Sequence, residues 1–274
     1  MQGKRVLITG STAGIGKAAA RQLAGAGAQV IVHGRDQAKV DLAINEIRSA
    51  TGSHSVTPLL CDLSQLPDVR RAATKLRSGP PLDAIICNAG VFLPRRELTT
   101  EGHERTFATV HLGHFLLTQL LLDHLKQAEQ GRVIFVGPPP GMAKVFFDDL
   151  TLAKGYSTLK AVNHAKGAML MCMRELARRL EGTRVTANSM LPGYMIKTEL
   201  HLKMPWAMRF FISLFGITSE KAAAPQAWLA SDPELAKVSG RHFHRFTQQQ
   251  IKGQAADDAA CRRMWDLSVS LVGL

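Results

Sequence analysis

Three glycines near the start of the chain are spaced as in a phosphate-binding turn. Gly10, Gly14 and Gly16 follow the apolar run Val6–Ile8, which is typical of a buried strand, and they precede a helical stretch over 17–26. Backbone N–H groups at a helix N-terminus attract a phosphate, and glycine lets a diphosphate come close because it has no Cβ. This order of strand, turn and helix predicts nucleotide contacts at Gly10, Ser11, Thr12, Gly14, Ile15 and Gly16.

Arg35 follows the second predicted strand, over 28–33, at the place where a charged side chain selects between two dinucleotides. A carboxylate here would bind a ribose diol, whereas an arginine pairs with a 2′-phosphate. We therefore expect NADP(H) as the cofactor, while the neighbouring Asp36 is a carboxylate that favours NAD(H).

Further polar and small residues come where later predicted strands end. Asp62 can accept a hydrogen bond from an adenine amino group, and small residues after the fourth strand let the chain pass close to a cofactor. Ligands bind at the carboxyl ends of the strands in open parallel sheets. The sequence therefore predicts further cofactor contacts at Asp62, Leu63, Asn88, Ala89, Gly90, Pro192 and Gly193.

Strands and helices alternate along the 274 residues, which predicts a Rossmann-type, doubly wound α/β fold in a single domain. We expect a mostly parallel sheet of seven strands with helices on both faces, and a last edge strand over 240–246. The apolar stretch 194–220 is expected as an inserted substrate loop or lid, which implies a hydrophobic small-molecule substrate. Contact with a membrane or a partner, and core or dimer packing, are the alternatives for this stretch.

The composition excludes several classes of protein. The formal net charge of +12 is spread over helices and turns, without a basic tail, so we expect no nucleic-acid partner; an acidic carrier protein is an alternative partner. The four cysteines lack metal spacing, which predicts no metal site and reduced thiols in a cytoplasmic protein. No apolar run reaches about 18 residues, and the first strand begins almost at Met1, so we expect neither a transmembrane helix nor a signal peptide.

Several of these motifs resemble the short-chain dehydrogenase/reductase family, and in particular its retinol-dehydrogenase-like members. The resemblance rests on the segments 9–16, 62–63, 88–90 and 192–193, and on the subgroup-like segments 111–118, 174–180, 238–243 and 263–274. It extends over essentially the whole chain. It implies an oxidoreductase that uses a nicotinamide cofactor and forms homo-oligomers through its two long helices.

The resemblance also implies four catalytic residues: a Tyr and a Lys four residues later on one helix, a Ser and an Asn. The segment 156–166 matches the subgroup's helix in a register that places the lysine at Lys166 and the tyrosine at Val162. In the same way the serine is expected at Pro138 and the asparagine at Val110. Only Lys166 then keeps its family type, and valine and proline side chains donate no proton.

Tyr156 and Lys160 offer a second register, because they also have the family's spacing. A shift of six residues turns a helix by about 240°, so the two registers cannot both face the cofactor. We favour the register of Val162 and Lys166. Other candidates for a catalytic role near this site are Tyr156, Tyr194 and His111.

Hydride transfer to a neutral ketone forms an alkoxide, which needs a proton donor and an oriented dipole. We therefore expect non-standard chemistry: hydride transfer to an activated or iminium-type acceptor, or a cofactor-assisted cyclisation or isomerisation. Two alternatives stay open. One is a carbonyl or alcohol oxidoreductase with a substitute proton donor such as Tyr156, and the other is a non-catalytic NADP(H)-binding protein.

Overall fold

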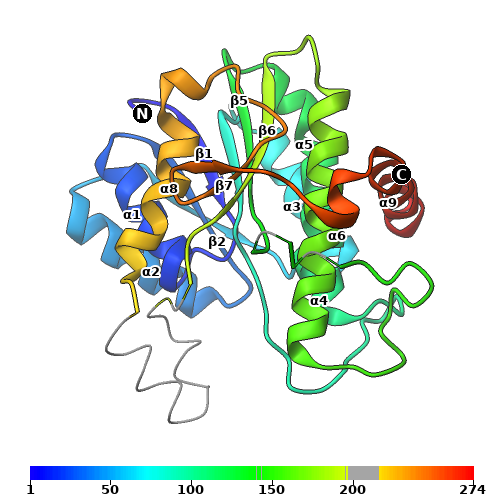
Figure 1. The fold of residues 1–274 in the computed structure, drawn as a ribbon. Helices are drawn as coiled ribbons and strands as arrows, with labels where there is room; N and C mark the ends of the chain where they lie inside the picture. The colour runs from blue at the N-terminus through cyan, green and yellow to red at the C-terminus, as the bar shows by residue number, and fades with distance from the viewer. Residues whose placement is uncertain (140, 143, 195, 197–215) are drawn as a thin grey trace.

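The computed structural model describes residues 1–139, 141, 142, 144–194, 196 and 216–274, which form one eight-stranded sheet between layers of helices (Figure 1). The strand order is β3-β2-β1-β4-β5-β6-β7-β8. All neighbouring strands are parallel except β7 and β8, which are antiparallel. The strands are β1 (Arg5–Ile8), β2 (Gln29–Gly34), β3 (Val56–Leu60), β4 (Ala84–Cys87), β5 (Gly131–Val136), β6 (Val185–Leu191), β7 (His242–His244) and β8 (Thr247–Gln249).

Helices cover both faces of this sheet, so the predicted doubly wound α/β class is confirmed (Figure 1). One face packs against α1, α2 and α8, and the other against α3, α5 and α6. The strand order reverses beside β1, which creates a crevice at the carboxyl ends of β1 and β4. The helices are α1 (Gly14–Gly25), α2 (Gln37–Thr51), α3 (Leu66–Arg77), α4 (Arg105–Phe107), η1 (Ala108–Leu112), α5 (Gly113–Lys126), α6 (Thr158–Arg179), α8 (Ser219–Ser231), η3 (Pro233–Leu235), η4 (Gly253–Ala256) and α9 (Asp258–Val272).

The sheet has one strand more than the seven that the sequence predicts. β7 is not an edge strand, because the chain turns back after two residues and adds β8 beside it. Arg245 in this turn has a φ of 55°, in the left-handed region where hairpins usually place glycine or asparagine. The turn contains neither of these residues, so the hairpin carries no sequence signal.

The long helix predicted over 104–129 is divided into three segments. Glu104 caps its start by accepting hydrogen bonds from the N–H groups of Thr106 and Phe107. η1 is a π-helical turn between α4 and α5, and such turns are frequent at functional sites. At Gly113 a Cβ would lie 3.0 Å from the Cβ of Leu63, so the glycine lets this helix pass close to the loop that follows β3.

The C-terminal helix α9 lies across the outer side of the layer that contains α3, α5 and α6. Its start is held by an ion pair from Arg174 to Asp258, at 2.9 Å. Its middle packs the ring of Trp265 edge-on against Phe115, with centroids 5.0 Å apart. Its end is held by Arg70 of α3, which donates to carbonyl groups at the C-terminus. α9 therefore ties three helices of one layer together.

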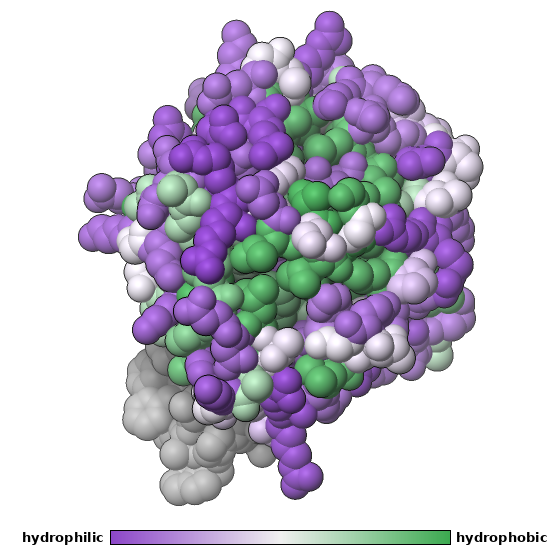
Figure 2. Space-filling model, turned by 90° about the vertical axis from the view of Figure 1, so that its right-hand side faces the viewer, coloured by the Kyte–Doolittle hydropathy of each residue, from purple (hydrophilic) through white to green (hydrophobic). Residues whose placement is uncertain are grey.

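Figure 2 shows the face of the molecule on which α9 lies. Hydrophobic residues gather across its middle and hydrophilic residues surround them. The partly buried Leu267, Val269 and Leu271 of α9 pack against the core on this side.

No helix among the described residues is long and apolar enough to cross a membrane. Most of the loop predicted over 194–220 lies outside the described residues. Its two ends meet, because Ile196 and Ile217 form an isolated parallel bridge.

Candidate functional site

The glycine turn lies between β1 and α1, where two of its residues have a left-handed backbone. Gly10 has a φ of 63° and Gly14 a φ of 55°, which disfavour any residue with a Cβ. A Cβ on Gly10 would also lie 2.8 Å from the Cα of Ala89, so the turn packs directly against the loop after β4. No side chain caps the N-terminus of α1, and its first turn holds no acidic residue. These features fit an anion at the end of the helix.

Three other predicted contacts of this turn, Ser11, Thr12 and Ile15, pack within the protein. The buried Ser11 donates from Oγ to the carbonyl of Ile8, at 2.7 Å, and accepts from the N–H of His33, at 2.9 Å. Its side chain therefore ties the loop to β1 and β2. Thr12 packs at the end of β2, where a Cβ on Gly34 would lie 2.6 Å from its Cγ2. Ile15 packs against the core beneath α1.

A buried hydrogen-bond network joins the glycine turn to β4 and α5. Thr9 Oγ1 accepts from the N–H groups of Asn88 and Ala89, at 2.9 and 3.0 Å, and lies 2.7 Å from Nε2 of His114. His114 Nδ1 donates to the carbonyl of Val110, at 2.9 Å, so Nε2 of the neutral ring accepts a hydrogen bond from the Thr9 hydroxyl. Burial lowers the pKa of His114 to about 4, which keeps the ring neutral.

Asn88 acts on the predicted cofactor site through the backbone of the turn. Its amide nitrogen donates to the carbonyl groups of Thr9 and Gly10, at 2.9 and 3.2 Å. Its amide oxygen accepts from Gln226 of α8, at 3.0 Å. The side chain therefore fixes the turn, and Gly90 follows it with open space at its Cα.

The ends of β2 and β3 carry the charged residues predicted to bind the adenosine part. Arg35 is exposed, whereas the neighbouring Asp36 caps α2 by accepting from the N–H of Lys39, at 3.0 Å. One carboxylate oxygen of Asp36 therefore serves as the helix cap, and the exposed Arg35 lies beside it at this strand end. Asp62 accepts from both the N–H and the hydroxyl of Ser64, at 2.9 and 2.7 Å. The next residue, Leu63, is buried.

Lys166 of α6 reaches the carboxyl end of β5. Its Nζ lies 3.4 Å from the carbonyl oxygen of Gly137, and burial lowers its pKa to about 8. Lys160, at the start of α6, instead donates to the carbonyl groups of Lys154 and Gly155 in the loop before this helix. Of the two lysines considered from sequence, Lys166 is therefore the one at the carboxyl end of a central strand.

The residues around Lys166 supply no polar side chain at the three positions singled out from sequence. Val162 of α6 is 6% exposed and Val110 of η1 is 2% exposed. Pro138, directly after Gly137, is also buried. The three positions at which the family resemblance implies polar residues are therefore occupied by buried apolar side chains.

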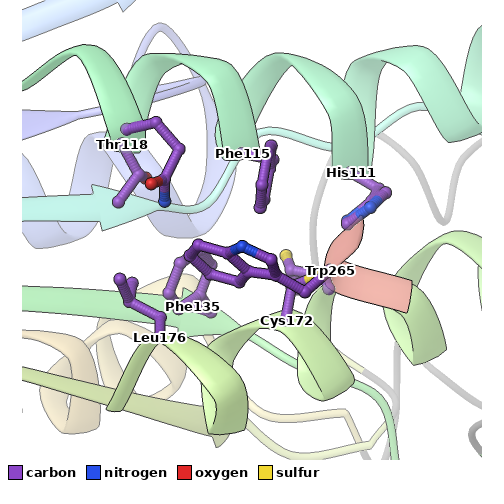
Figure 3. Close-up of a pocket in the computed structure, with 9 residues that line it drawn as sticks. His111, Phe115, Thr118, Phe135, Cys172, Leu176 and Trp265 are labelled. Atoms are coloured by element: carbon purple, nitrogen blue, oxygen red, sulfur yellow. The ribbon is translucent and has the colours of Figure 1, made fainter. Parts of the chain in front are cut away.

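The three substitute candidates have other contacts. Tyr156 donates its hydroxyl to the carbonyl of Leu93, at 2.9 Å, and burial raises its pKa. Tyr194 is 52% exposed and packs edge-on against His244. His111 is buried with Nε2 2.8 Å from Ser268 Oγ of α9, and burial lowers its pKa to about 3. It lines a small cavity between α5, α6 and α9, together with Phe115, Cys172 and Trp265 (Figure 3).

Pro192 and Gly193 follow β6 as predicted, at the same edge of the sheet. Pro192 is buried, and Gly193 has a φ of 127°. A Cβ on Gly193 would lie 2.9 Å from Ile217 Cδ1, so glycine is needed where the chain passes the base of the 194–220 loop. No cluster of three or more possible metal ligands occurs among the described residues.

One polar pair beside β5 was not predicted from the sequence. His242 of β7 lies opposite Ser189 of β6 in the sheet, and its Nδ1 is 2.7 Å from the serine Oγ. Both residues are buried, and the other ring nitrogen, Nε2, has no hydrogen-bond partner among the described residues. The pair has no local signal, because its members are 53 residues apart and meet only through the strand order.

Comparisons with known proteins agree with this arrangement. The chain is 36% identical over 297 residues to human retinol dehydrogenase 14, covering 100% of this chain and 88% of the relative. It is 38% identical over 283 residues to human retinol dehydrogenase 13, covering 99% and 85%. A crystal structure of an uncharacterized protein from Mycobacterium paratuberculosis is 28% identical, with a TM-score of 0.78 over 99% of this chain and 94% of that one.

More distant structures share the fold. A 3-ketoacyl-(acyl-carrier-protein) reductase from Brucella melitensis, complexed with NADH, has a TM-score of 0.70 at 22% identity and covers 89% of this chain and 96% of its own.

The family model for short chain dehydrogenases matches residues 4–205. The chain therefore belongs to the short-chain dehydrogenase family of oxidoreductases.

Proposed function

We propose that this oxidoreductase binds NADP(H) and transfers hydride to a hydrophobic acceptor that already carries a positive charge. The observation that carries the proposal is the end of β5. There Lys166 reaches Gly137 O, while Pro138 and Val162 give the site no hydroxyl group.

Residues of the site fit the cofactor part by part. The uncapped N-terminus of α1 fits the diphosphate, because its N–H groups face the glycine turn. The exposed guanidinium of Arg35 fits a 2′-phosphate, since the neighbouring Asp36 is used as a helix cap. Lys166, at the end of β5, fits a hydrogen bond to the nicotinamide ribose.

The class of acceptor follows from the lack of a hydroxyl group at Pro138 and Val162. NADPH, when bound, would supply a hydride to the acceptor carbon and be left as NADP⁺, while the C=N π pair of an iminium would move to nitrogen and cancel its charge. No proton is taken up in this step. Reduction of a neutral carbonyl would instead leave an alkoxide beside Val162 and Pro138, where the described side chains donate no proton.

The names of the relatives support a hydrophobic substrate, because retinol is an apolar alcohol. The loop over 194–220 is also rich in apolar and aromatic residues, among them Trp206, Phe210 and Phe211. A substrate with an aromatic or polycyclic body and a cationic C=N group meets both requirements.

The proposal is tested by following NADPH oxidation with two hydrophobic acceptors, all-trans-retinal and N-methyl dihydroisoquinolinium. General acid catalysis contributes about 10²–10⁴-fold to the rate, so we expect kcat/KM for the iminium to exceed that for retinal by at least about 100-fold. Faster reduction of retinal would show that a proton donor is present. No oxidation with either acceptor, by protein that binds NADPH, would favour a non-catalytic role.

A further inference from the structure

The imidazole of His242 occupies the space that Gly137 leaves empty. A Cβ on Gly137 would lie 3.2 Å from Cε1 and 3.4 Å from Nδ1 of this ring, and 3.5 Å from the Cβ of Ser189. Only the distance to Cε1 is shorter than ordinary contact, so a Cβ at position 137 would require the ring to shift by a few tenths of an ångström. The glycine and the histidine therefore form a matched pair at the end of β5.

Two elements bring polar groups to Gly137 from different directions. Lys166 comes from α6 and lies 3.4 Å from the glycine carbonyl. His242 comes from β7 and is held by Ser189, at 2.7 Å. At this strand end His242 supplies a polar side chain where Pro138 and Val162 supply none.

The ring is neutral and incompletely bonded. Burial, with a further contribution from His244, lowers the pKa of His242 to about 4. Its Nε2 atom is buried and has no partner among the described residues. Buried polar atoms in proteins are normally paired, so the unpaired Nε2 of a ring that lies beside Gly137 is a place where a ligand can supply the missing partner.

We propose that His242 Nε2 accepts a hydrogen bond from the N–H of a protonated imine substrate. This rests on the function proposed above and narrows its substrate class from any iminium to one with an N–H group. In the required tautomer Nδ1–H donates to Ser189 Oγ, which leaves the Nε2 lone pair free. A neutral imidazole in this place binds the cation without taking its proton, and it adds no positive charge to that of Lys166.

The test compares two acceptors that differ only at nitrogen: protonated dihydroisoquinoline, which has an N–H, and its N-methyl iminium, which has none. In His242→Phe we expect kcat/KM for the N–H acceptor to fall about 10- to 100-fold, the range for a hydrogen bond to a charged group. The value for the N-methyl acceptor should change by less than about twofold, since it makes no such bond.

Two variants separate this role from a structural one. Gly137→Ala, which requires the ring to shift, should reduce kcat/KM selectively for the N–H acceptor. His124→Phe is the control, because it removes another buried ring, near the C-terminal end of α5, that is bonded to the carbonyl of Pro80. It should leave the ratio of kcat/KM between the two acceptors unchanged.

The outcomes keep the two proposals apart. Equal losses for both acceptors in His242→Phe, or no loss for either, would overturn the role of His242 and leave the proposed function standing. If the wild-type protein reduced neither acceptor, the proposed function and this inference would both fall. A crystal structure of the NADP⁺ complex with His242 Nε2 bonded to a protein group would also overturn the inference.

Discussion

The backbone N–H of Gly10 donates to Nδ1 of His33, at 3.0 Å, so the ring beneath the glycine turn is held in one tautomer. The same histidine binds Ser11 through its backbone N–H. Burial, with a further contribution from the neighbouring His114, lowers the pKa of His33 to about 4. A neutral His33 therefore supports the glycine turn, because a proton on Nδ1 would break its bond to Gly10.

We expect the free energy of unfolding to decrease as the pH falls from about 6.5 towards about 4. Unfolded histidines bind protons near the upper value, whereas the folded protein resists protonation, so added protons favour unfolding. Urea unfolding at neutral pH and near pH 5 measures this difference. Burial lowers the pKa to about 3 for His111 and to about 4 for His33, His114, His164 and His242.

The exposed His54 provides the matched control, since His54→Gln removes an imidazole without changing the core. Its pH dependence should follow that of the parent protein. Equal stability at both pH values in the parent would contradict a set of neutral, buried rings.

Arg35→Ala should weaken NADPH binding about 10- to 100-fold, because it removes a charged hydrogen bond to the 2′-phosphate. NADH binding should change little, since NADH lacks this group. Calorimetric titration with both cofactors measures the preference. Arg77→Ala, at an exposed arginine near the end of α3, is the control for loss of one positive charge. A parent protein that binds NADH more tightly than NADPH would contradict the role given to Arg35.

Much of the backbone geometry of the candidate cofactor site could be predicted from sequence because its signals are local. The strand, glycine turn and helix of residues 6–25 follow one another along the chain, and the left-handed backbone of Gly10 and Gly14 agrees with their residue type. Asn88 was correctly placed at a strand end. Its hydrogen bonds to the turn and to Gln226 could not be foreseen, because they join elements far apart in the chain.

The remaining features depend on tertiary packing. The β7–β8 hairpin turns at Arg245 without glycine or asparagine, so residue type does not reveal it. His242 meets Ser189 only after β6 and β7 pair in a particular register. His111 of η1, a catalytic candidate, lies 2.8 Å from Ser268 of α9, and no local pattern in the sequence identifies that partner.

NADP⁺ affinity should decrease as the pH rises through about 8, where Lys166 loses its proton. Burial lowers the pKa of this lysine from its usual 10.5, so its charge is present below about pH 8 and lost above it. Titration of NADP⁺ across this range should show a pH dependence that disappears in Lys166→Met. Lys160→Met, on the exposed start of the same helix, should keep it. An unchanged pH dependence in Lys166→Met would show that another group is responsible.

Trp265→Ala should lower the free energy of unfolding by about 3–5 kcal/mol, the range for loss of a large buried aromatic side chain. The indole packs against Phe115, and Arg179 lies over its ring, so its removal opens a cavity between α9 and the helices below. Denaturant unfolding measures the loss, and Leu274→Ala, at a half-exposed position, is the control.

The same variant bears on assembly. The sequence predicts a homo-oligomer formed through the two long helices, α5 and α6, yet α9 lies over part of that layer. If subunits do not meet directly through α5 and α6, Trp265→Ala should have the same oligomeric state as the parent protein. Light scattering measures this state.

The most direct test of the central claim, that Tyr156 is not a catalytic proton donor, is kcat/KM of Tyr156→Phe with NADPH and all-trans-retinal, a neutral carbonyl whose reduction needs a proton. Tyr156 donates its hydroxyl to Leu93, so we expect the variant to keep the parent activity within about twofold. A loss of about 10²–10⁴-fold, the contribution of a general acid, would show that Tyr156 is the proton donor and would contradict the account.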